Sequence, residues 1–292
     1  MGVLVNQFTA RMQPASYVMN LPFTVGIEIE VNDRNGNSSR DMTTIRRALA
    51  HKNLGDWVVK PDYSAGRYGG VAGPEIISPV LHTWEDLRKT SKVITTLKRL
   101  GFKTNHRCGL HIHLGCMNLS MPQDSPTTEN DRNNFFKLLL RYEEAFFKLA
   151  DQSRQANHFC SKIPDPMFKE IRRGRGIRAW RGEFNTICND RYFWVNARSL
   201  SRHGTLEFRL MKCELDFNLV KGWACLLLMA ACHTMKLKKS VRWGKARAKN
   251  DLVLICTLLK QAGCYNREID RTIRTTAKNW TLSRFRQLQL NT

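Results

Sequence analysis

Residues 23–31, FTVGIEIEV, alternate between apolar side chains and small or charged ones. On a β-strand successive side chains point to opposite faces, so the apolar residues would share one face and Glu28 and Glu30 the other. The two carboxylates would lie roughly 6.6 Å apart, at about 3.3 Å of rise per residue. Such a face is either solvated or holds positive charge, and this stretch alone does not distinguish the two.

The same alternation recurs in two later stretches. In CGLHIHLG, residues 108–115, His111 and His113 would share one strand face, and in GTLEFRLM, residues 204–211, Glu207 and Arg209 would do so. The residues between them are apolar. Strands with an apolar back and a charged or imidazole front predict a sheet that is buried on its back, and one such sheet would bring the fronts together.

Periodicity and capping signals predict the remaining elements. Further strands are expected at 57–64, 75–81 and near 191–200, and helices at 41–51, 83–100, 129–150, 217–238, 251–262 and 266–290. Asp41 is the expected N-cap of the first helix, and Thr83 with Asp86 resembles a capping box at the start of the second. Because strands and helices do not alternate regularly, the pattern favours an α+β fold. We expect an α+β domain over 1–215 and a basic helical region over 216–292 packed on it.

Charge is the unusual feature of the composition. The 292 residues include 47 basic and 25 acidic ones, a formal net charge of +22, while the apolar content of 42% is that of an ordinary globular protein. Basic residues concentrate in 236–286, and five arginines lie within 171–182. Such a surface attracts polyanions, so nucleic acid and an acidic substrate are both partners that would suit it.

Cysteine usage and hydropathy bear on the compartment. The nine cysteines include no CxxC pair, which argues against a zinc ribbon and favours a reduced setting. The first residues lack the pattern of a secretory signal. The longest apolar run, residues 223–232, is shorter than a bilayer span. We therefore expect a cytoplasmic protein with no membrane partner.

The polar strand faces offer the ligands of a hard metal ion. Glu75, which heads an apolar strand after Gly-Pro, adds a carboxylate to those of Glu28, Glu30 and Glu207. Carboxylate oxygens favour Mg²⁺ or Mn²⁺ over Zn²⁺. Cations held by carboxylates beside an arginine are what phosphoryl transfer requires. The chain has no GxxxxGK[ST] loop, which argues against a P-loop fold. The His-x-His pair leaves a zinc or manganese hydrolase as an alternative.

The ordered set of motifs resembles the amidoligase family, which is related to glutamine synthetase and glutamate–cysteine ligase. The motifs are GIEIE, KPDYS, GPEIISPVL, CGLHIHLG, an asparagine-bearing strand and GTLEFR, and they span about residues 23–215. The resemblance implies a glutamine-synthetase-like antiparallel sheet that forms a funnel for ATP and two or three Mg²⁺ ions. It also implies a ligase that phosphorylates a carboxylate to an acyl phosphate, which an amine then converts to an amide.

The resemblance further implies a ligand set. Glu30 and Glu75 match ligands of the metal nearest the substrate. Glu28, His111 and Glu207 match ligands of the metal that bridges the ATP phosphates.

Roles in catalysis and substrate binding follow from the same motifs. Arg209 matches the arginine that meets the transferring phosphoryl group, and together with Glu207 and Asp62 it makes up the expected catalytic set. Asp62 is also an expected substrate contact. The remaining expected contacts to phosphate or substrate are Asn196, His113, Arg178, Arg181 and Arg191.

Two departures from the family pattern concern the substrate. Tyr63 follows Asp62 where the family has a small residue, and the glycine-rich link at 65–73 is long. The carboxylate and the amine are not identified, although a peptide or an acidic polymer would suit the charge. A basic nucleic-acid-binding protein that uses a non-catalytic version of the fold is the alternative function. The oligomeric state cannot be inferred from the sequence.

Overall fold

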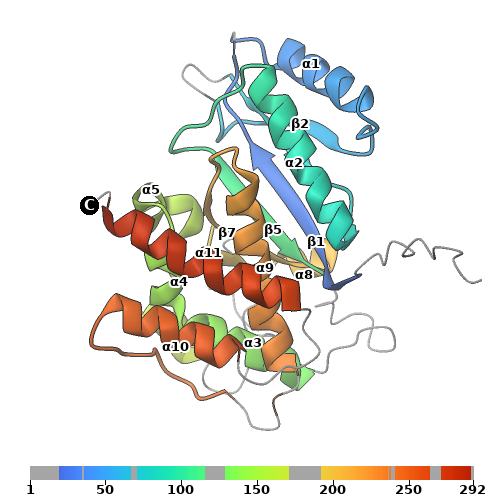
Figure 1. The fold of residues 1–292 in the computed structure, drawn as a ribbon. Helices are drawn as coiled ribbons and strands as arrows, with labels where there is room; N and C mark the ends of the chain where they lie inside the picture. Colours follow the sequence, from blue (N-terminus) through green and yellow to red (C-terminus); the bar gives the residue numbers. More distant parts are fainter. Residues whose placement is uncertain are drawn as a thin grey trace, which may run out of the picture.

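The fold is built on one antiparallel sheet with helices packed against it (Figure 1). The computed structural model describes residues 20–34, 36–66, 71–115, 129–170, 192–235, 237, 241–263 and 271–290. Within these residues the strand order is β2-β3-β1-β5-β7-β6, and β4 pairs with β1. The expected α+β class with an antiparallel sheet is confirmed.

The long first strand lies in the middle of this sheet. The strands are β1 (Asn20–Glu30), β2 (Val58–Asp62), β3 (Gly73–Ile77), β4 (Leu81–Thr83), β5 (Gly109–Leu114), β6 (Val195–Asn196) and β7 (Leu206–Lys212). The single strand expected over 75–81 is wrong, because β3 ends at Ile77 and β4 begins at Leu81. Pro79 lies between them, and proline has no N–H to donate to a ladder.

The long helices follow the predicted periodicity, whereas the short helices between residues 152 and 203 were not expected, and one of them begins within the stretch expected as a strand near 191–200. They are α1 (Ser38–Ala50), α2 (Trp84–Arg99), α3 (Glu129–Arg141), α4 (Glu143–Leu149), α5 (Gln152–Gln155), the 3₁₀ helix η1 (His158–Cys160), α6 (Asp165–Glu170), α8 (Ser199–His203), α9 (Phe217–Met235), α10 (Asp251–Gly263) and α11 (Arg271–Leu290). The capping box of Thr83 and Asp86 is present. Asn37 caps α1 instead of Asp41, which is buried in the first turn. The helix expected over 129–150 is two helices that meet at Tyr142.

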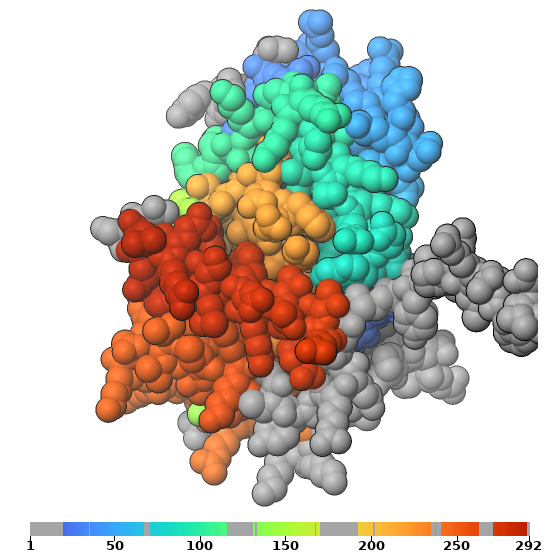
Figure 2. All heavy atoms as spheres, viewed as in Figure 1, coloured from blue at the N-terminus to red at the C-terminus, as the bar shows by residue number. Residues whose placement is uncertain are grey.

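Helix α9 covers the apolar back of the sheet. It contacts β1 and β5, α2 packs beside it, and α11 lies over it, as Figure 1 shows. Gly222 of α9 permits this approach, because a Cβ there would lie 2.1 Å from Trp280 Cδ2 of α11. Helices α10 and α11 form the outer surface of this side, orange to red in Figure 2. The division into domains at residue 215 stays a prediction.

The apolar character of α9 reflects its place in the core. By length and composition its window Phe217–Thr234, with a mean hydropathy of 1.2, could cross a membrane. Within the protein 83% of that window is buried. This is the burial expected of a core helix, and the apolar side chains of α9 are satisfied by the sheet and by α11.

Candidate active site

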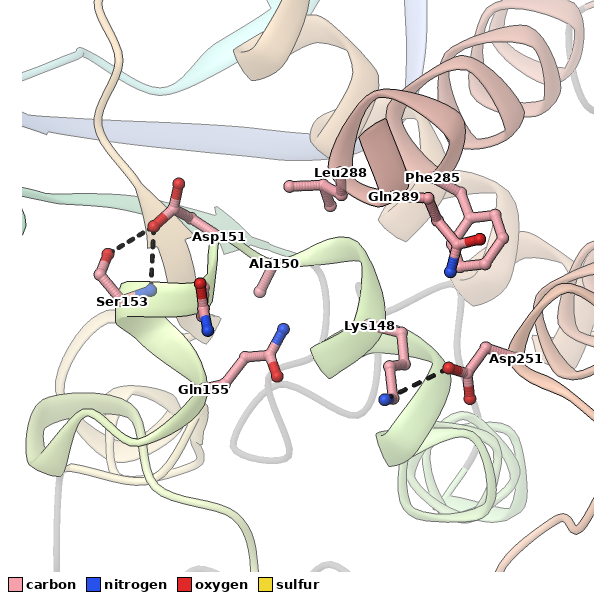
Figure 3. Close-up of a pocket in the computed structure, with 10 residues that line it drawn as sticks. Lys148, Ala150, Asp151, Ser153, Gln155, Asp251, Phe285, Leu288 and Gln289 are labelled. Carbon is pink, nitrogen blue, oxygen red and sulfur yellow. Dashed lines mark hydrogen bonds and ion pairs between the residues drawn. The ribbon is translucent and has the colours of Figure 1, made fainter. Parts of the chain in front are cut away.

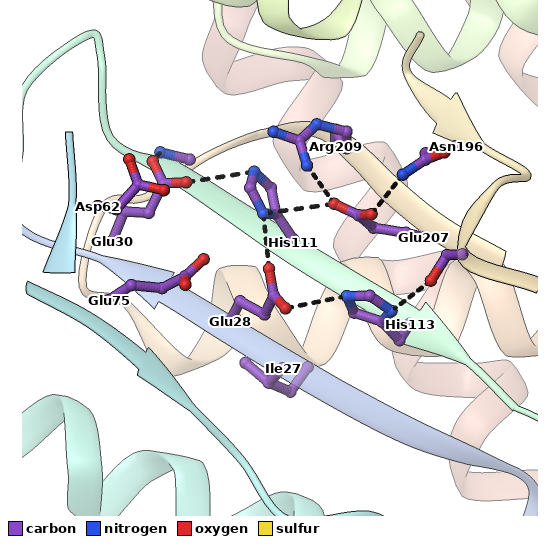
Figure 4. A network of polar contacts seen from close by, with 12 residues as sticks. Ile27, Glu28, Glu30, Asp62, Glu75, His111, His113, Asn196, Glu207 and Arg209 are labelled. Carbon is purple, nitrogen blue, oxygen red and sulfur yellow. Dashed lines mark hydrogen bonds and ion pairs between the residues drawn. The ribbon is translucent and has the colours of Figure 1, made fainter. Parts of the chain in front are cut away.

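The register of the sheet brings the predicted polar side chains together. Three directly opposed pairs make up its centre: Glu28 with His111, Glu30 with Glu75, and His113 with Glu207. Opposed residues of neighbouring strands point to the same face. Figure 4 shows these side chains gathered over β1, β3, β5 and β7. The face predicted from alternation therefore exists as a single surface.

His111 lies at the centre of the cluster. Its Nδ1 is 2.9 Å from Glu28 Oε2 and 3.6 Å from Glu207 Oε1, and its Nε2 is 3.5 Å from Glu30 Oε1. The imidazole thus belongs to two groups, one with Glu28 and Glu207 and one with Glu30 and Glu75, each with donor atoms within 4.8 Å of one another. The residues of each ligand set expected from the motifs thus lie together, and His111, expected in one set, is next to both. Their role as metal ligands stays a prediction. A neutral imidazole has one acceptor nitrogen, so His111 can serve one group at a time.

Glu207 is held from both sides. Arg209 Nη1 donates to Glu207 Oε1, and Asn196 Nδ2 donates to Glu207 Oε2 at 2.7 Å. Arg209 Nε also donates to the carbonyl oxygen of Phe159, at 3.3 Å. Arg209 and Asn196 therefore orient a carboxylate that also faces His111.

The end of β2 supplies a lysine and an aspartate. Lys60 Nζ lies 2.8 Å from Glu75 Oε2, and Asp62 Oδ1 accepts hydrogen bonds from the backbone N–H of Ser64 at 2.6 Å and of Ala65 at 3.2 Å. Asp62 thus forms a turn directly after the strand. The sequence reasoning missed Lys60, although strand alternation places it on the same face as Asp62.

His113 connects the site to the chain around α8. Its Nε2 is 3.3 Å from Glu28 Oε1, and its Nδ1 is 2.9 Å from Thr205 Oγ1. Ser199 Oγ lies 2.8 Å from the same Thr205 hydroxyl. These contacts fix the orientation of His113 beside Glu28. No pattern in the sequence identifies Ser199 or Thr205.

A glycine allows the close packing around His111. A Cβ at Gly109 would lie 2.7 Å from His111 Nε2 and 3.3 Å from Glu30 Oε2. The Gly109 N–H donates to that Glu30 oxygen at 2.6 Å. The start of β5 therefore needs a residue without a side chain, whereas the sequence had indicated only that glycines bound this strand.

Two carboxylates stay ionised despite their burial. Burial acts to raise the pKa of Glu28, but hydrogen bonds from His111 and His113 outweigh it and hold the pKa below its usual range. Burial likewise acts to raise the pKa of Glu207, and the positive charge of Arg209 outweighs it and lowers the pKa. Both groups can therefore accept cations at neutral pH.

The other two carboxylates of the cluster, Glu75 and Glu30, resist ionisation. Burial, with a further contribution from the charge of Glu28, raises the pKa of Glu75 to about 7, even though Lys60 acts against the shift. Burial also raises the pKa of Glu30. Two buried carboxylates side by side in a low dielectric favour a divalent cation between them, which would offset both their burial and their repulsion. The donor set thus fits a hard metal ion.

The cluster forms the floor of a cavity of about 600 Å³. Asp62, His113, Asn196 and Arg209 line it. It is also lined by cationic and aromatic side chains that the motifs did not indicate: Lys60, Arg107, Arg198, Arg202, Tyr63, Phe159 and Tyr192. The expected contacts Arg178, Arg181 and Arg191 lie outside the described residues. The roles of all these residues stay predictions.

A second cavity, of about 660 Å³, lies among α4, α5, α10 and α11 (Figure 3). Lys148 and Asp251 form an ion pair of 3.2 Å on its wall. None of the site residues predicted from the sequence lines it. The chemistry indicated by the motifs therefore belongs to the first cavity.

Comparison with models of known protein families agrees with the motifs. The model of a family described as "Putative amidoligase enzyme" matches residues 21–230. No curated protein sequence matches the chain. One similar structure is a chain in the crystal structure of the complex between the prokaryotic ubiquitin-like protein Pup and its ligase PafA. Its TM-score is 0.41 at 10% identity, and the match covers 92% of this chain but 65% of that one. On the family match, this chain belongs to the amidoligase family of amide-bond-forming carboxylate–amine ligases.

Proposed function

We propose that the protein joins a carboxylate to an amine at the expense of ATP, with Mg²⁺ or alternatively Mn²⁺, through an acyl phosphate. The observation that carries the proposal is the pair of donor groups that meet at His111, with Arg209 and Glu207 beside them. Amide formation from a free carboxylate is uphill in water at neutral pH, so activation by a phosphoryl group supplies a chemical reason for such a site. Membership of the amidoligase family supports the same reaction type.

The carboxylates and His111 of the cluster are the proposed metal ligands. Glu28, His111 and Glu207 would hold one cation, and Glu30 with Glu75 a second. Bound there, the cations would neutralise charge on phosphate oxygens.

The proposed reaction has two steps. A carboxylate oxygen of the substrate forms a bond to the γ-phosphorus of ATP, and the bond from that phosphorus to the oxygen of ADP breaks. The amine nitrogen then attacks the carbonyl carbon, the carbon–oxygen bond to phosphate breaks, and the nitrogen loses a proton. Arg209, which Glu207 and Phe159 hold in place, binds the phosphoryl oxygens through its guanidinium. Asp62 on β2 and Asn196 on β6, the two ends of the strand order, both line the cavity and bind the amine and the carboxylate.

The cationic wall of the cavity supports an anionic substrate. Lys60, Arg107 and Arg202 line the same space as the carboxylate cluster, and cations there would attract a peptide or polymer rich in carboxylates. The nucleic-acid alternative rests on overall charge, and no residue of α10 or α11, which carry part of the basic C-terminal region, is among those that line the cavity.

The proposal is tested by ADP release over a matrix of carboxylates and amines, with mass spectrometry of the product. We expect release only when ATP, a divalent cation, a carboxylate and an amine are all present. Release that does not depend on the amine or the carboxylate would contradict the ligase reaction. Tight, salt-sensitive binding of RNA or DNA without turnover would favour the alternative, and stoichiometric bound zinc would favour a hydrolase.

A further inference from the structure

Arg154 is a buried arginine with no counter-ion in the described part of the chain. It lies in α5, is 2% exposed, and forms no ion pair with any carboxylate among the described residues. Its Nε is buried and has no hydrogen-bond partner in that part of the chain. Burying a charged group without an opposite charge is costly. The position of Arg154 therefore calls for a role other than simple packing.

Within the described residues, the Arg154 side chain donates one hydrogen bond, and it goes to the main chain of Arg209. Arg154 Nη2 donates to the Arg209 carbonyl oxygen at 2.8 Å. The register of β6 and β7, with Asn196 opposite Glu207 and Val195 opposite Phe208, continues to Trp194 opposite Arg209. The Arg209 N–H indeed donates to the Trp194 carbonyl at 2.8 Å. In a regular antiparallel pair the Trp194 N–H would return a bond to the Arg209 carbonyl.

That second hydrogen bond is missing because the Trp194 N–H has a different acceptor. The Trp194 N–H donates to the Ser161 carbonyl at 3.0 Å, in the chain segment that follows η1. The Arg209 carbonyl therefore loses its partner within the sheet, and the guanidinium of Arg154 supplies the donor. Arg154 completes the hydrogen bonding of the sheet at the residue that faces the phosphoryl group in the proposed reaction.

The other edge of β7 is irregular at the same residue. Leu110 lies opposite Met211 and Ile112 opposite Phe208, so His111 alone faces both Arg209 and Leu210. This is a β-bulge, which bends a strand and re-aims its side chains. Regular pairing therefore fails on both edges of Arg209, and its main chain needs support from outside the sheet.

The segment that carries Arg154 also holds the side chain of Arg209. The carbonyl oxygen of Phe159, in η1, accepts the hydrogen bond from Arg209 Nε at 3.3 Å. Asp151, just before α5, pairs with Lys212 of β7 at 3.3 Å. Residues 151–160 thus clamp β7 at two places, and the contacts to Arg209 secure both its main chain and its guanidinium.

We propose that Arg154 is a positioning residue that fixes the bulged main chain of Arg209 and thereby the placement of the Arg209–Glu207 pair. This proposal rests on the proposed function, because it is through Arg209 that Arg154 affects phosphoryl transfer. Arg154 reaches β7 through the main-chain carbonyl of Arg209 and is not among the residues that line the cavity. Its loss should therefore change the rate of the chemical step more than the binding of ATP.

The kinetic test compares Arg154→Met with Arg154→Lys. We expect Arg154→Met to lower kcat on the order of tenfold to a hundredfold, the range seen for residues that orient ligands of a site, with KM for ATP within about twofold. Arg154→Lys, which keeps the charge and a donor, should retain an intermediate kcat. Lys212→Met is the matched control, because it breaks the other clamp between this segment and β7 and should leave kcat within about twofold.

A second readout separates this proposal from the proposed function. Hydrogen–deuterium exchange over residues 206–212 should be faster in Arg154→Met than in the wild type, with exchange in α2 unchanged. A wild type without ATP turnover would refute the proposed function, while exchange in β7 would still decide whether Arg154 holds the strand. Wild-type kcat and wild-type exchange in Arg154→Met would overturn the proposal. If that variant does not fold, a fully active Arg154→Lys with unchanged exchange would overturn it.

Discussion

The two faces of the central sheet make opposite contributions to the protein. On the back, alternate residues such as Ile27, Ile29 and Ile76 are fully buried against the helices. On the front, their chain neighbours are carboxylates and imidazoles that gather into one cluster. The same strands therefore build a core on one side and a site on the other. Burial of the charged front face lowers the stability of the fold, whereas burial of the apolar back face raises it.

Two neighbouring residues of β3 show how much the free energy of burial differs between the two faces. Glu75 is 3% exposed and Ile76 is 0% exposed. Burying an isoleucine side chain stabilises a fold by about 1.5–3 kcal/mol. A pKa of about 7 for Glu75, raised from 4.5, means that its ionised form is disfavoured in the folded protein, by an amount on the order of 3 kcal/mol. Burial therefore stabilises the fold at Ile76 and destabilises it at Glu75, although the two residues are adjacent and almost equally buried.

The largest expected effect is on turnover when a carboxylate of the front face is neutralised. Glu75→Gln keeps the shape of the side chain but removes a ligand charge, so we expect turnover to fall by at least two orders of magnitude. Steady-state ADP release measures it. Glu85→Gln, an exposed carboxylate paired with Arg88 on α2, is the matched control and should be silent. Full activity in Glu75→Gln would remove this residue from the site.

Metal binding should stabilise the wild type through the front face alone. A ligand at a hundred times its Kd adds about 2.7 kcal/mol, which corresponds to a rise in Tm of several degrees for a chain of this size. Differential scanning calorimetry with Mg²⁺ and with Mn²⁺ measures it. Glu30→Gln should weaken the dependence on metal concentration, because it removes a donor from one group. An equal shift in both proteins would place the metal elsewhere.

The pH dependence of stability should reveal the cost of burying the ionised carboxylate of Glu75. Because the pKa of Glu75 is raised from about 4.5 to about 7 on folding, the folded state binds more protons than the unfolded state between these values. Its contribution to stability is therefore present below about pH 4.5 and is lost as pH rises to about 7. In chelator-treated protein, Glu75→Gln should gain about 1–3 kcal/mol on the wild type between pH 5 and pH 8. Urea unfolding at both pH values measures it, and a difference that does not change with pH would contradict this shift.

The smallest expected effect comes from the back of the same strand. Ile76→Val removes one buried methyl group and should lower the free energy of unfolding by about 0.5–1.5 kcal/mol. Turnover per folded molecule should not change, because Ile76 points away from the cavity. Urea unfolding and ADP release on the same sample measure both. A loss of turnover that exceeds the unfolded fraction would show that the two faces are coupled.

The sequence predicts the two faces well because alternation is a local property. Glu28, His111 and Glu207 come from three strands that are far apart in the chain, yet each could be assigned to a polar face from its neighbours alone. The register that sets Glu28 opposite His111 depends on long-range pairing. The family resemblance, and not periodicity, supplied the division of the ligands into two groups, and the structure brings the residues of each group together, with His111 next to both. The role of these residues as metal ligands stays a prediction.

The irregular parts were not predictable in the same way. Pro79 gives a local reason for the break between β3 and β4, so that signal was present in the sequence. The bulge in β7 and the bond from Arg154 to the Arg209 carbonyl have no local signal, because they depend on where Trp194 and Ser161 meet. Arg154 reads as an ordinary charged residue of a short polar stretch. Only the tertiary structure shows its hydrogen bond to the main chain of Arg209, from which we infer a positioning role.

Transfer of oxygen from the substrate to phosphate tests the central claim most directly. With a carboxylate substrate labelled with ¹⁸O in both oxygens, an acyl phosphate leaves one labelled oxygen on the inorganic phosphate when the amine displaces it. We predict one ¹⁸O per phosphate released, in step with amide formation, and no such phosphate from Glu75→Gln. Phosphate without label, formed at the rate of amide formation, would contradict the acyl-phosphate reaction at this site.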